Sequence, residues 1–231
     1  MQGFRCWEVG WAFLAVLEAV AGAQTPRLGR IGAALALEGE IAEARRVDAE
    51  LDGLEQEMRR TSGDDPPQPA WRSRYRELQL RCARVKQAAI ARAIEAYNID
   101  VGSVPFGVHY SVHGGMRERE GATYLDQDGT IRVEIGDEAF RSAAQLGSTI
   151  GHEVEVHVNR QIVKQVFYPQ GDEQGTLIQE VEAYDYELAN SDRYGLSHDE
   201  VKLLKRRRAI HYQRLQWENR KRVDASIYTK W

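Results

Sequence analysis

Hydrophobic residues recur at three- and four-residue steps along the first part of the chain. The spacing covers Leu28 to about Arg60 and returns from Trp71 to Tyr97. This period predicts two amphipathic helices. Between them, residues 61–69 hold three prolines and a glycine, which interrupt helices and central strands alike. We therefore expect an antiparallel helical hairpin over residues 28–98, with a structural role as a stalk or cover.

The pattern changes after Asn98 to β-branched residues, glycines and alternation. Strands are predicted within residues 104–112, at 124–125 and at 131–135, where Ile and Val alternate with Arg and Glu. Asp128-Gly129 between the last two favours a tight turn. A β-hairpin is the specific prediction for this stretch.

Helical spacing resumes in the last third of the chain. We expect one helix across residues 140–162, a second over 177–193 that ends at Gly195, and a third running to about Arg220. Ser197 and Glu200 form a Ser-x-x-Glu capping box that would begin the third helix. The fold class is therefore α+β.

Length and composition limit the choice of function. The 231 residues fit one domain with a helical arm, the hairpin being followed by a unit over residues 99–231. A net charge of -4 provides no basic field for nucleic acid. With only Cys6 and Cys82 present, a metal would have to be bound by histidine and carboxylate.

Residues 1–23 have two interpretations. Arg5, the apolar run of residues 11–20 and the small residues 21–23 are typical of a cleaved export signal. Glu18 within the run favours an amphipathic first helix instead. In either case the run is too short and interrupted for a stable membrane span.

The candidate metal-binding and catalytic side chains lie together in residues 151–157, Gly-His-Glu-Val-Glu-Val-His. A hydrolytic zinc needs imidazole ligands, an open position for water and a carboxylate that accepts a proton from that water. His152 and His157 are the candidate zinc ligands, and Glu153 is the candidate general base.

The spacing of these histidines sets a structural condition. Five steps of an α-helix rotate His157 by about 140° from His152, so a π-type widening of the helix is expected between them. Two alternatives stay open. The segment could be a half-buried strand without metal, because valines alternate with polar residues, or Glu153 and His157 alone could bind a metal.

The motif His152-Glu153-x-x-x-His157 (HExxxH) resembles the zinc motif of the dipeptidyl peptidase III family. That resemblance implies that both histidines bind zinc, that the glutamate activates water, and that a downstream acidic motif supplies the third, glutamate ligand (gluzincin-like). On this basis Glu182 is the preferred third ligand and Glu180 the alternative. Asp185 would hydrogen-bond a ligand imidazole and orient it.

A broader similarity extends over roughly residues 104–220. The His-Glu helix, the segment Gln179–Glu187 and Tyr194-Gly-Leu-Ser197 resemble the metallopeptidase-like toxin domains of bacterial polymorphic and Rhs-type toxins, most of which have the shorter His-Glu-x-x-His spacing. The resemblance implies a zincin-like domain, secretion or delivery to a target cell, and an immunity protein that neutralises the toxin.

The sequence therefore predicts a zinc-dependent peptidase acting on a protein or peptide, which would add as a strand along residues 130–135. His211 or Tyr212 could polarise the substrate carbonyl, although a packing role is more common for such residues. The competing hypothesis is a non-catalytic helical interaction protein, in which the hairpin binds a partner and the His-Glu cluster is structural.

Overall fold

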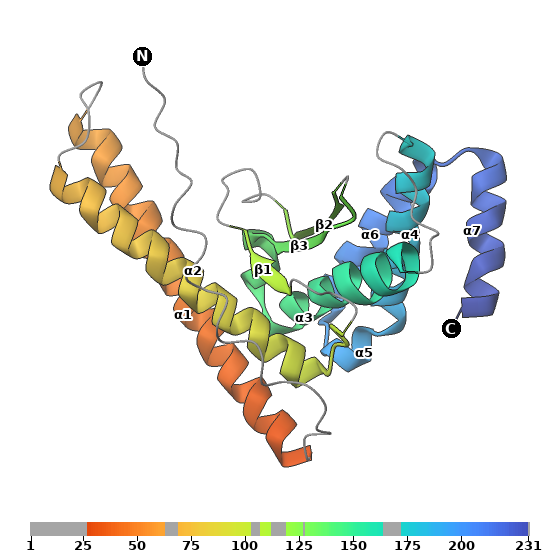
Figure 1. Cartoon of the computed structure of the whole chain (residues 1–231), viewed down its shortest axis with the longest axis horizontal. Helices are drawn as coiled ribbons and strands as arrows, with labels where there is room; N and C mark the ends of the chain where they lie inside the picture. The colour runs from red at the N-terminus through yellow and green to blue at the C-terminus, as the bar shows by residue number, and fades with distance from the viewer. Residues whose placement is uncertain are drawn as a thin grey trace.

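A computed structural model describes residues 27–62, 69–102, 107–111, 119–126, 128–163 and 172–230. The two interpretations of residues 1–23 lie outside these residues. The described part combines helices with one small mixed sheet, so the α+β prediction is confirmed. Its long hairpin lies on one side of the sheet and a group of helices on the other (Figure 1). No helix among the described residues is long and apolar enough to cross a membrane.

The hairpin consists of α1 (Arg27–Ser62) and α2 (Pro69–Tyr97), close to the predicted bounds. Its outer half has an apolar cluster of its own, formed by Val47, Leu51, Leu54, Leu78 and Cys82. The other half joins the main core through Leu37, Ile41, Ala89, Ile90 and Ala93, which pack with the sheet and the next helices. The arm and the rest of the chain therefore share one hydrophobic core.

A buried charge also joins the hairpin to the sheet. The side chain of Lys86 in α2 is 0% exposed, and its Nζ lies 2.8 Å from Asp48 Oδ1 in α1 and 2.7 Å from Asp137 Oδ1 after the last strand. Tyr110 donates a hydrogen bond of 2.7 Å to the same Asp137 oxygen. A buried lysine needs such partners, because an uncompensated charge is costly inside a protein.

The sheet has the order β1-β3-β2. β3 (Ile131–Ile135) pairs in parallel with β1 (Val108–Tyr110) and antiparallel with β2 (Gly121–Leu125). The predicted β-hairpin is confirmed, with Gly129 in the turn at φ +83°. The prediction that residues 130–135 form an open edge is wrong, because β3 is hydrogen-bonded on both sides. The edge strands are β1 and β2.

The register of β2 decides which of its backbone groups face outward. Glu120 accepts a hydrogen bond from Gly136, and Asp126 donates one to Thr130. In an antiparallel pair, hydrogen-bonded and non-hydrogen-bonded residues alternate. The even-numbered residues of β2 therefore bond to β3, while the N–H and C=O groups of Gly121, Thr123 and Leu125 point to the free edge.

The helical part follows the sheet. It consists of a 3-10 helix Asp137–Arg141, α3 (Ala143–Gly151), a π-helix His152–Ile162 labelled η3, α4 (Glu173–Ala189), α5 (Ser191–Tyr194), α6 (His198–Arg214) and α7 (Trp217–Lys230). The predicted capping box at Ser197 and Glu200 is present, and so is the helix end at Gly195, with φ 70°.

The predicted final helix through Arg220 is wrong. It breaks at Leu215, whose ψ is 142°. Leu215 is 3% exposed and packs with Leu177, Ile178, Val181 and Val223 of α4 and α7. Burial of this leucine against α4 thus accounts for the turn between α6 and α7.

Candidate metal centre

The two motif histidines lie on a widened helix. α3 changes at His152 into the π-helix η3, which continues for eleven residues. At its end Val163 donates to the carbonyl of Val158, five residues earlier, at 3.0 Å. The predicted π-type widening is confirmed, although it is longer than a single turn. The strand alternative for these residues is wrong.

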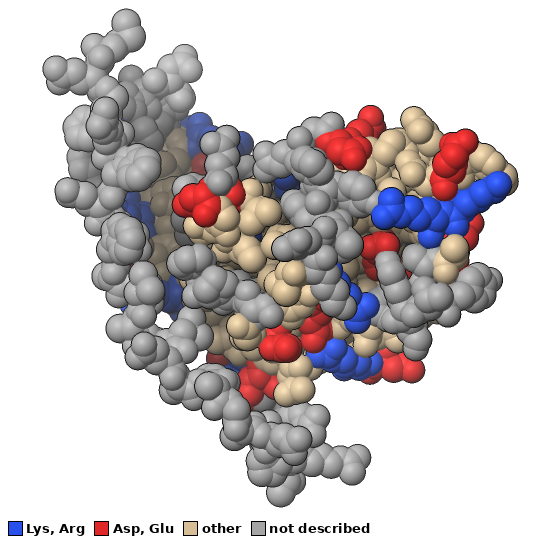
Figure 2. Space-filling model, turned by 45° about the vertical axis from the view of Figure 1, so that its right-hand side comes forward, with Lys and Arg blue, Asp and Glu red and all other residues tan. Residues whose placement is uncertain are grey.

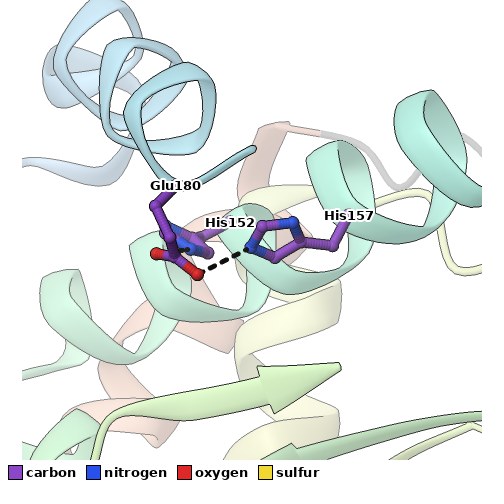
Figure 3. A group of neighbouring side chains, drawn as sticks. All are labelled: His152, His157 and Glu180. Atoms are coloured by element: carbon purple, nitrogen blue, oxygen red, sulfur yellow. Dashed lines mark ion pairs between the residues drawn. The ribbon is translucent and has the colours of Figure 1, made fainter. Parts of the chain in front are cut away.

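The wide turn brings both imidazoles to one carboxylate. His152 Nε2 lies 3.6 Å from Glu180 Oε2, and His157 Nε2 lies 3.7 Å from Glu180 Oε1. In Figure 3 Glu180 reaches from α4 towards the two rings, which project from η3 on the same side. The three ligand atoms lie within 4.8 Å of one another. Because both histidines take part, the geometry does not favour a Glu153–His157 pair without His152.

These distances can be compared with the separation of ligand atoms in a tetrahedral zinc site. Ligand atoms held tetrahedrally at zinc distances lie about 3.3 Å from each other. The separations of 3.6 and 3.7 Å between each Nε2 and Glu180 approach this value. Two imidazoles and one carboxylate also form a donor set of catalytic zinc sites, with the fourth position left for water. These three side chains could therefore hold a metal ion such as zinc.

The other nitrogen of each imidazole is already bound. His152 Nδ1 lies 2.7 Å from Glu187 Oε1, and Ser148 donates to the second oxygen of Glu187 at 2.5 Å. His157 Nδ1 lies 2.7 Å from Gln161 Oε1. Acceptors at both Nδ1 atoms favour the tautomer that leaves Nε2 free as a ligand. These contacts orient both rings towards Glu180.

The structure places the preferred third ligand elsewhere. Glu182 lies near Gln161, whose Nε2 is 3.4 Å from Glu182 Oε2. Two residues correspond to about 200° around an α-helix, so Glu180 and Glu182 cannot both face the histidines. The structure brings the alternative, Glu180, to the site.

Asp185 does not contact an imidazole either. Its carboxylate forms an ion pair with Arg208 of α6, in which Arg208 Nη2 donates to Asp185 Oδ2 at 3.1 Å. The orienting role predicted for Asp185 is thus taken by Glu187 in this structure. Glu187 lies two helical turns after Glu180 and therefore on the same face of α4, a spacing that could have identified it. Gln161, four residues after His157, could have been found in the same way.

Glu153 is buried beside the candidate ligands, with an exposure of 5%. Thr123 of β2 donates to its Oε2 at 2.7 Å. A Cβ on Gly121 would lie only 2.7 Å from Glu153 Oε1, so this glycine allows the carboxylate to lie against β2. Burial raises the pKa of Glu153, while His157 and His152 act against the rise. A raised pKa suits a carboxylate that must accept a proton near neutral pH.

The ligand side chains influence each other's charge. Burial by itself would lower the pKa of His152, but Glu180 and Glu187 raise it well above its ordinary value. Burial would raise the pKa of Glu180, but the neighbouring imidazoles lower it to about 2. The carboxylates thus favour positive charge at this point, whether it is carried by a proton or by a metal ion.

A cavity of about 370 Å³ opens over the site. Its walls include Glu153, His152 and Glu180, together with Tyr184 and His211. Burial raises the pKa of Tyr184, so its hydroxyl stays protonated. His211 Nδ1 lies 3.0 Å from the carbonyl of Arg207 and is therefore the protonated nitrogen, which leaves Nε2 as the second polar atom of the ring.

A second hollow of about 340 Å³ lies on the other side of Glu180 and His211, which line both spaces. Arg214 and Glu173 form an ion pair of 2.7 Å along it. Tyr212, an alternative to His211 in the sequence prediction, instead donates to Asp224 at 2.9 Å. Of the two candidates, only His211 therefore lines the hollows beside the site.

Two glycines of α3 allow aromatic rings to pack behind the helix that leads into His152 and His157. A Cβ on Gly151 would lie 2.0 Å from the hydroxyl of Tyr194, and one on Gly147 would lie 2.3 Å from the ring of Tyr97. The two rings meet edge to face at 5.4 Å. Arg193 adds hydrogen bonds to the carbonyl of Tyr97 and to Glu155. The end of the hairpin thus supports the helix that carries the histidines.

Surface charge adds little to this picture. Figure 2 shows acidic and basic side chains interspersed on the face in view, without a large area of one sign, in line with the small net charge.

Comparisons with known proteins identify no relative: no family model, no curated protein and no solved structure matches the chain.

Proposed function

We propose that the chain is a zinc-dependent peptidase with a zincin-like domain, in which His152, His157 and Glu180 bind the metal. One observation carries the proposal: both Nε2 atoms converge on Glu180 at 3.6 and 3.7 Å. The buried carboxylate of Glu153 lines the same cavity. Ligands, a base and an open space for substrate are the parts that metal-assisted hydrolysis requires.

Each side chain has a chemical task in this proposal. Zinc bound here would polarise the substrate carbonyl and lower the pKa of the attacking water. Glu153 accepts the proton of that water and passes it to the leaving amine, while Thr123 fixes its orientation. Tyr184 and His211, which line the cavity, donate hydrogen bonds to the carbonyl oxygen as it gains negative charge; for His211 this requires the protonated ring.

The edge of β2 provides a place for the substrate backbone. Gly121 and Thr123 present outward N–H and C=O groups by the register described above, and their side-chain positions face Glu153. An extended peptide added to this edge would pass beside the base. This arrangement favours a protein or peptide substrate.

Metal analysis and three variants test the proposal. We expect near one zinc per chain, and Glu153→Gln should keep the zinc but abolish hydrolysis in a broad peptide-profiling digest. Glu180→Gln should lower zinc affinity by more than about 100-fold, since even outer contacts contribute 10- to 100-fold. Glu182→Gln is the matched control and should retain the metal.

Two outcomes would contradict the proposal. A metal-replete preparation without zinc would exclude the metal site. Zinc-loaded protein whose hydrolysis is unaffected by Glu153→Gln would leave a structural zinc site, as the interaction-protein hypothesis expects.

The biological role is a separate proposal that depends on the toxin-domain resemblance. We propose that the peptidase acts in a target cell and that the producing cell makes a neutralising partner. Expression in a susceptible bacterium tests this role. The native chain should arrest growth and Glu153→Gln should not, while equal growth of both strains would contradict it.

A further inference from the structure

Most charged side chains that line the cavity have a partner within the protein. Each carboxylate that lines the cavity has a hydrogen-bond or ion-pair partner. Glu120 is bound by Arg207 and Gln145, and Glu153 by Thr123. Glu180 lies beside the two histidines, and Glu187 is bound by Ser148 and His152. Of the two arginines in the lining, Arg207 is thus paired. Arg119 has no acidic partner among the described residues. The guanidinium of Arg119 is therefore available to a negatively charged substrate group where β2 begins.

The second hollow differs in this respect. Its arginine, Arg214, is paired with Glu173 at 2.7 Å, and its wall includes the apolar side chain of Leu177. Among the described residues, the second hollow therefore offers a substrate anion no unpaired arginine.

The direction of β2 relates Arg119 to the bond that is cut. β2 runs from Gly121 to Leu125, and an antiparallel partner, the more stable kind, runs the opposite way. The C-terminal part of such a substrate lies next to Gly121 and the residues before it. Two extended residues span about 7 Å, so Arg119 lies one or two substrate residues beyond the level of Glu153.

We infer that the site selects substrates with a carboxylate one or two residues after the cleaved bond, and that the Arg119 guanidinium binds it. The carboxylate can belong to an Asp or Glu side chain or to the C-terminus of a short peptide, since an arginine binds both in the same bidentate manner. This inference rests on the proposed peptidase function and names its substrate class.

The test compares peptides of one sequence with Glu, Gln or Lys at each of the two positions after the cut, with free or amidated C-termini. Cleavage by the zinc-loaded protein should be roughly 5- to 10-fold faster in kcat/KM for Glu than for Gln, the range of a partly exposed charged pair. Arg119→Gln should abolish this preference and Arg119→Glu should reverse it towards Lys. Arg206→Gln, an exposed arginine that lines neither hollow, is the control and should preserve it.

A binding measurement separates this inference from the proposed function. Fluorescence anisotropy of the same labelled peptides with zinc-loaded Glu153→Gln protein reports selectivity without turnover. Hydrolysis with equal rates for Glu, Gln and Lys peptides, or a preference that survives Arg119→Gln, overturns the inference and leaves the peptidase standing. Absence of zinc and of all hydrolysis overturns the peptidase itself. Loss of the preference on amidation alone identifies the terminal carboxylate as the bound group.

Discussion

Gly121 offers the sharpest probe of how the general base is positioned. A Cβ at this residue would lie 2.7 Å from Oε1 and 2.8 Å from Cγ of Glu153. Carbon atoms in contact prefer about 3.5 Å or more, so Gly121→Ala must displace the middle of the Glu153 side chain by roughly 0.7 Å. The proposed zinc ligands lie on η3 and α4, and the three atoms nearest to the added Cβ all belong to Glu153, so the substitution should not displace the ligands.

The expected effect falls on turnover rather than on metal binding. A misplacement of about 1 Å in a catalytic group costs on the order of 100-fold in rate, so kcat/KM of Gly121→Ala should fall by about that factor. The zinc content should remain near one per chain. Overpacking should cost about 1–3 kcal/mol in the free energy of unfolding, measured by urea denaturation of the zinc-loaded protein.

Ala122→Ser is the matched control, because its side chain points to the opposite face of β2. It should keep full activity and stability. If Gly121→Ala were as active as the native protein while binding zinc, Glu153 would not act from the position described, and the assignment of the base would have to be abandoned.

Three further predictions concern separate parts of the molecule. Glu187→Gln should weaken zinc binding by about 10- to 100-fold in a chelator competition, whereas Asp185→Asn should not change it; equal effects would contradict the orienting role of Glu187. Lys86→Met should lower the free energy of unfolding by about 3–5 kcal/mol, because two aspartates lose their buried partner, and the exposed control Arg84→Met should stay within about 0.5 kcal/mol; a neutral Lys86→Met would refute the buried-charge argument. Burial raises the pKa of the Cys82 thiol to about 12, so iodoacetamide at pH 8 should modify Cys82 only after unfolding, as followed by peptide mapping, and rapid modification of the folded protein would be inconsistent with this burial.

Local patterns were sufficient to predict much of the fold. The apolar period over residues 28–98 predicted the hairpin because both helices have one buried face. Asp128-Gly129 predicted the turn because Gly129 adopts the positive φ of +83° that the turn requires. The five-residue spacing of His152 and His157 predicted the π-helix, since a regular α-helix would turn the two rings apart.

Long-range packing determined what the sequence could not show. Glu180 and Glu182 flank the buried Val181, and which of them meets the histidines depends on how α4 packs against η3. The break at Leu215 likewise depends on burial against α4. Gly121 and Thr123 lie thirty or more residues before Glu153, and no local pattern links them to it.

The packing behind the helix that carries His152 and His157 has a practical consequence for dividing the chain into fragments. Tyr97 of α2 fills the space that Gly147 leaves open, and the carbonyls of Tyr97 and Asn98 accept hydrogen bonds from Arg193. A fragment that begins at residue 99 would lack this ring and would expose the apolar surface that the hairpin covers. The hairpin therefore supports the helix that carries His152 and His157, and a fragment intended to keep this site should include α1 and α2.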